Sequence, residues 1–192
     1  MPDHAREPTS VPLIDIQARW GYSEIVDSTA SHNYDCGMGI DELRAKRTEG
    51  VRFEQLSGGE RYKLAFYTAQ VRFPLFVFFT GTDLFNLVQI GRERLAQLYV
   101  PQAVWAEQSE GRCMPFGEYM AIPTDNDNDA RNVTLKEPTY RAPIDPITVG
   151  RFYTDPVLLD GFHRAALFWK FAPAGETLLA YVPRGLSPAI RA

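Results

Sequence analysis

The stretch Pro156–Ala172, PVLLDGFHRAALFWKFA, changes character abruptly at Asp160 and Gly161. Before that pair lies a short apolar run, which predicts a buried strand over Val157–Leu159. After it nearly every side chain is apolar, and Lys170 is the only charge beyond the first turn. A helix of this composition, from Gly161 to about residue 172, has to be covered by other parts of the protein.

The segments on either side extend this stretch into a larger unit. Ile147–Phe152 (ITVGRF) predicts a strand, and the YTDP turn separates it from the apolar run. After a PAG stop, Thr177–Val182 (TLLAYV) predicts another strand. The last 46 residues therefore predict a ββαβ unit. The fold class that follows is α/β (α+β), a single domain built on one mixed sheet.

The remaining chain gives weaker signals. Short alternation, aromatic runs and helical spacing of apolar residues each predict an element. The expected elements are a strand at Val11–Ile16, a polar helix at Asp41–Arg47, two strands within Leu64–Phe79 meeting near Arg72–Pro74, a helix at Thr82–Tyr99 and a strand at Pro115–Pro123.

Composition limits the classes of function. The chain has 192 residues, a net charge of −4 and only two cysteines, Cys36 and Cys113. This predicts one domain without a disulfide framework or zinc ribbon, and an acidic protein is a poor candidate for nonspecific nucleic-acid binding. Residues 1–10 are expected to be a flexible lead-in without a signal peptide. The most apolar run, Pro74–Gly81, is too short to cross a bilayer as a helix, so a soluble cytoplasmic protein is expected.

Three other patterns suggest sites and fail on inspection. LSGGERYKLA (Leu56–Ala65) resembles the signature loop of ABC-type ATPases, but the chain has no G-x-x-x-x-G-K-[ST] loop, and a Ser-Gly-Gly turn entering a strand is the preferred interpretation. The Asp125, Asp127 and Asp129 series lacks the glycine and the last acid of a calcium loop. The histidines His4, His32 and His163 have no metal-ligand spacing, so no metal site is assigned.

The first turn of the 161–172 helix has the chemistry of an anion site. With Asp160 as N-cap, Gly161, Phe162, His163 and Arg164 occupy the first four helical positions. Free amides, the helix dipole, a glycine and a forked guanidinium together suit a phosphate, and the histidine adds a donor. The alternative is an ion pair between Arg164 and Asp160, four residues apart, without any ligand. The residues alone leave the two interpretations equally supported.

PVLLDGFHRAALF, placed between ITVG and TLLAYV, resembles the core of the ParB/sulfiredoxin superfamily. The resemblance covers about the last quarter of the chain, with residues 11–16 as a first strand. It implies a nucleotide phosphate bound by Gly161, Phe162, His163 and Arg164, with Asp160 shaping the turn. Sulfiredoxins look like G-C-H-R at this point, so Phe162 argues against sulfinic acid repair. Residues 20–140 are then expected to be an insertion within a single 11–192 domain.

The function expected from this resemblance is binding of ATP or CTP and transfer or hydrolysis of a phosphoryl group, as in a kinase or nucleotide hydrolase. His163, Arg164 and Asp160 would be the catalytic residues, acting on an acceptor that the sequence does not identify. Mg²⁺ is the implied cofactor, with Asp160, Asp155 and Asp145 as the nearest acids in sequence. The alternative is a noncatalytic or nuclease-type DNA-binding protein, whose basic residues would be Arg44, Lys46, Arg47, Arg92 and Arg94.

Overall fold

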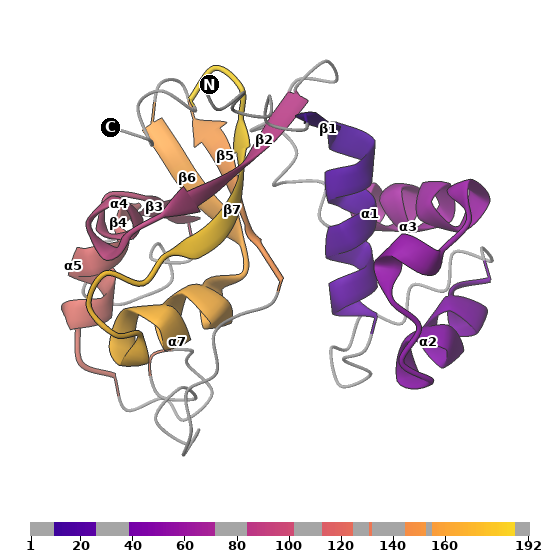
Figure 1. Ribbon diagram of the computed structural model, residues 1–192, viewed down its shortest axis with the longest axis horizontal. Helices are drawn as coiled ribbons and strands as arrows, with labels where there is room; N and C mark the ends of the chain where they lie inside the picture. Colours follow the sequence, from indigo (N-terminus) through magenta and orange to yellow (C-terminus); the bar gives the residue numbers. More distant parts are fainter. Residues whose placement is uncertain are drawn as a thin grey trace, which may run out of the picture. The chain divides into compact units, whose positions relative to one another are not determined.

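The computed structural model describes residues 10–25, 39–71, 84–101, 113–124, 131, 145–152 and 155–186. Contacts divide the chain into two compact units. One unit comprises Met1–Ser10 and Leu84–Ala192, and the other comprises Val11–Asp83. Figure 1 shows strands β2 to β7 with helices α4, α5 and α7 in the first unit, and helices α1, α2 and α3 in the second.

The strands form a mixed seven-stranded sheet, which confirms the α/β class, and β2 to β7 belong to the first unit. Its strand order is β1-β2-β7-β5-β6-β3-β4. Antiparallel pairs (β2 with β7, β5 with β6, β3 with β4) alternate with parallel pairs (β5 with β7, β3 with β6). The strands are β1 (Ser10–Pro12), β2 (Leu84–Ile90), β3 (Tyr99–Val100), β4 (Met114–Pro115), β5 (Ile147–Phe152), β6 (Asp155–Asp160) and β7 (Leu178–Pro183).

The predicted ββαβ unit is present. Strands β5 and β6 pair antiparallel, helix α7 (Phe162–Phe171) follows, and β7 then runs parallel to β5 with Ile147 opposite Ala180. Helix α7 buries Ala165, Ala166 and Phe168, in the same core as residues of β5 and β7. The long apolar run therefore serves packing against the sheet, and only the first turn of the helix is left for polar chemistry.

Two short helices that are distant from α7 in the sequence lie beside it in this unit. Helix α4 (Arg92–Ala96) and helix α5 (Phe116–Ala121) both contribute buried side chains to the core that includes Phe168. Gly117 of α5 lies close to α4 and α7, because a Cβ there would be 3.1 Å from Ala96 Cβ and 3.5 Å from Trp169. Close helix contact at a small residue is the reason that this packing is possible.

The second unit is helical in its described residues. It contains α1 (Leu13–Glu24), α2 (Ile40–Thr48), a short 3-10 turn (Phe53–Gln55) and α3 (Gly58–Val71). Its core is a separate cluster around Tyr22, Leu43 and Leu64. At Gly21 the backbone of α1 lies close to α3, since a Cβ at that position would lie 2.3 Å from Thr68 Oγ1 and 3.0 Å from Leu64 O.

Several expectations for the N-terminal two thirds are wrong. The strand expected at Val11–Ile16 is present only at Val11 and Pro12, because β1 ends at Pro12, which is the N-cap of α1. A six-residue alternation is too short to separate a strand from the start of a helix that follows a proline. The Asp41–Arg47 helix is confirmed as α2.

The aromatic segment from Leu64 to Val71 belongs to α3 and is not a strand, while residues 72–79 lie outside the described part of the chain. Its helix start is set by Ser57 and Glu60, and a S-x-x-E pattern is the signal that identifies such a start. Aromatic residues favour strands only weakly, so the cap prevails over their propensity.

Two further assignments exchange helix for strand. Thr82–Tyr99 was expected to be one helix, but it contains strand β2, with Phe85, Val88 and Ile90 buried, and then the short α4 after Gly91. Pro115–Pro123 was expected to be a strand, but it contains α5. Apolar runs this short fit the period of a helix and the period of a strand alike, so packing against the rest of the fold decides which of the two forms.

Candidate functional site

The α7 head, defined here as Asp160–Arg164, begins where β6 ends. Gly161 has φ +86° and is itself the N-cap of α7, so the expectation that Asp160 is the N-cap is wrong. Phe162, His163 and Arg164 are consequently the first three helical residues. The N-cap glycine makes no side-chain cap hydrogen bond, and the first helical turn contains no acid. The N-cap residue itself therefore gives the first-turn amides no side-chain acceptor.

Gly161 is required by conformation and by packing. Its positive φ is the left-handed region that L side chains rarely adopt. A Cβ would also lie 2.7 Å from Ile147 Cγ2, 2.8 Å from Arg164 Nη2 and 2.9 Å from Arg164 Nε. The space that glycine leaves open is therefore occupied by the strand β5 side chain and by the guanidinium of Arg164.

Arg164 is paired with Asp160. Its Nη2 donates to Asp160 Oδ2 over 2.8 Å, and the two side chains are 23 % and 15 % exposed. The ion pair that the sequence offered as an alternative is thus formed. Arg164 Nε is buried and has no hydrogen-bond acceptor among the described residues. A buried donor without a partner costs free energy, so the guanidinium is only partly satisfied by this pair.

The two aromatic neighbours have different environments. The ring of Phe162 packs edge-on against Phe116 and Tyr119 of α5, with centroids 5.5 Å and 5.4 Å away. Phe162 therefore ties the first turn of α7 to α5 and offers an anion its backbone amide. His163 is exposed at the second helical position. Its imidazole is available to a ligand in solution.

Three residues that contact the α7 head, Ile147, Phe116 and Tyr119, were absent from the sequence-based site. Ile147 comes from strand β5 and covers Gly161, and Tyr119 comes from α5 and contacts Phe162. Arg131 belongs to the same region, since its guanidinium lies 4.4 Å from the Tyr119 ring centroid and donates to Ile122 O. No local sequence pattern links these residues, because their proximity depends on strand order and helix packing.

The acids expected near a metal do not gather in the described residues. Asp155 begins β6 and pairs with Phe152, so it lies at the opposite end of the strand from Asp160. Asp145 is exposed just before β5. Within the described ranges no three His, Cys, Asp or Glu side chains form a metal-binding group. The Asp125–Asp129 series lies outside the described residues. Mg²⁺ stays a prediction.

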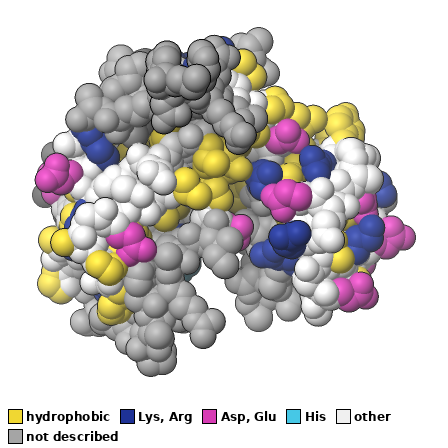
Figure 2. All heavy atoms as spheres, in the orientation of Figure 1, with side chains coloured by type: hydrophobic (Ala, Val, Ile, Leu, Met, Phe, Trp, Pro, Cys, Tyr) yellow, Lys and Arg dark blue, Asp and Glu magenta, His cyan; other side chains and the backbone are white. Residues whose placement is uncertain are grey.

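The five basic residues considered for DNA binding have separate surroundings. Arg44 binds Asp41 and Ile25 O, Lys46 binds Glu60, and the Arg47 guanidinium lies 5.0 Å from the Tyr22 ring centroid. In the sheet unit, Arg92 donates to Ala172 O and Arg94 to Gln97 Oε1. On the face drawn in Figure 2, Lys and Arg side chains lie among Asp and Glu side chains. These contacts are those of solvated or structural cations.

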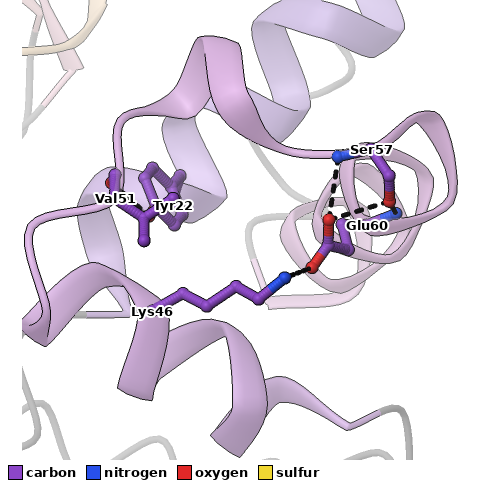
Figure 3. A network of polar contacts seen from close by, with 5 residues as sticks. All are labelled: Tyr22, Lys46, Val51, Ser57 and Glu60. Carbon is purple, nitrogen blue, oxygen red and sulfur yellow. Dashed lines mark hydrogen bonds and ion pairs between the residues drawn. The ribbon is translucent and has the colours of Figure 1, made fainter.

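The SGGE segment is a helix cap. Glu60 Oε2 accepts from the Ser57 amide and hydroxyl, both over 2.8 Å, and Glu60 Oε1 binds Lys46 of α2 (Figure 3). The bond to Lys46, followed by those to Ser57, lowers the pKa of Glu60 to about 2. Nearby, Tyr22 donates to Val51 O, and burial raises the pKa of Tyr22. The Ser57 hydroxyl is used within the chain, which supports the rejection of the ABC-type interpretation.

Comparison with protein-family models, with curated proteins and with solved structures gives no match. The resemblance to the ParB/sulfiredoxin superfamily and the insertion expected at residues 20–140 therefore stay predictions. In the described parts of the chain, no helix is both long and apolar enough to span a membrane.

Proposed function

We propose that the α7 head binds the phosphate of a nucleotide, ATP or CTP, and that the protein transfers or hydrolyses a phosphoryl group. The observation that carries the proposal is the buried Nε of Arg164, which has no acceptor among the described residues, beside a helix start whose N-cap is a glycine. A phosphate oxygen can accept from a guanidinium and from helix amides at the same time. Such a ligand would satisfy both sets of donors.

In this proposal Gly161, Phe162, His163 and Arg164 have separate roles. Gly161 turns the chain so that the amides of Phe162, His163 and Arg164 point out from the helix start. Arg164 supplies a permanent positive charge and a fork of donors, and exposed His163 supplies a further donor. Phosphoryl transfer depends mainly on positioning the phosphate and on stabilising its negative charge. The amides, Arg164 and His163 can do both.

A thermal-shift panel of the four nucleoside triphosphates, each with Mg²⁺, tests the proposal. Binding to the folded state alone stabilises it by about 2.7 kcal/mol at a hundredfold excess over Kd. We expect ATP or CTP to raise the unfolding temperature of the wild type by several degrees, and Arg164→Gln to abolish the rise. Arg184→Gln removes an exposed arginine after β7 and is the matched control.

A wild type that responds to none of the four nucleotides would refute the proposal. The same conclusion follows if Arg164→Gln responds as strongly as Arg184→Gln. Release of inorganic phosphate, followed with the nucleotide that binds, then distinguishes hydrolysis from binding alone. Addition of candidate acceptors under the same conditions tests for transfer.

A further inference from the structure

We draw no further inference here: the strongest candidate, the exposed face of helix α3 formed by Tyr62 and Phe66, carries none because nothing in the described part of the chain shows what covers it.

Discussion

At the scale of single residues, Gly161 and Gly175 illustrate two reasons why a position needs glycine: a left-handed backbone conformation, and the lack of space for a side chain. Both have a left-handed φ, +86° and +84°. A Cβ at Gly161 would contact Ile147 and Arg164 below 3.0 Å, whereas a Cβ at Gly175 would have nothing within 4 Å. The first position is limited by backbone conformation and by packing, and the second by conformation alone.

We therefore predict that Gly161→Ala is the more destabilising of the two substitutions. Left-handed backbone costs about 1–2 kcal/mol for an L residue, and overpacking adds about 1–3 kcal/mol. Denaturant unfolding should show a loss of about 2–4 kcal/mol for Gly161→Ala and about 1 kcal/mol for Gly175→Ala. Equal losses at both sites would mean that Ile147 and Arg164 move aside freely.

Glu60 gives a prediction for pH. Its pKa falls from 4.5 to about 2 on folding, through bonds to Lys46 and Ser57, so the unfolded chain takes up the proton first as the pH drops. The stabilisation is complete above about pH 4.5 and is lost as the pH falls toward 2. Glu60→Gln should cost about 0.5–1 kcal/mol at pH 7, and the difference from the wild type should shrink toward pH 3.

Unfolding measured at pH 7, 5.5, 4 and 3 checks this, with Glu49→Gln at the exposed end of α2 as the control. A difference between the wild type and Glu60→Gln that stays constant from pH 7 to pH 3 would contradict the assigned role.

At the scale of elements, the contact of α1 with α3 depends on one missing side chain. The Thr68 hydroxyl donates to Leu64 O within α3, and Gly21 of α1 lies directly against both. A glycine inside a helix costs about 1 kcal/mol relative to alanine. Gly21 is explained by the short distance between α1 and α3 at this position, which a side chain would prevent.

Gly21→Ala is thus expected to destabilise the helical unit by about 1–3 kcal/mol, despite the gain in helix propensity. Gly59→Ala, in the first turn of α3 with nothing within 4 Å of the added Cβ, should instead be neutral or stabilising by up to about 1 kcal/mol. Thr68→Ala should recover part of the loss when combined with Gly21→Ala, and a double-mutant cycle by denaturant unfolding measures the coupling. Strict additivity would show that the two residues do not meet.

At the scale of the whole molecule, local sequence was sufficient where consecutive segments agreed. The β5-β6-α7-β7 unit was predicted because short strands, a glycine turn and a long apolar helix follow one another without a break. Four assignments were wrong in whole or in part, because short apolar or aromatic runs fit a helix and a strand alike. They are the assignments of Val11–Ile16, Leu64–Val71, Thr82–Tyr99 and Pro115–Pro123.

The sequence by itself determined the chemistry of the α7 head: a glycine, a histidine and an arginine at the start of an apolar helix, with an acid four residues before the arginine. Only the tertiary structure decided how these groups are used. It made Gly161 the N-cap, placed Ile147 over it, and left Arg164 bound to Asp160 with Nε unpartnered. The physical reason is that these contacts depend on strand β5 and on side-chain direction, which the spacing of residues along the chain does not specify.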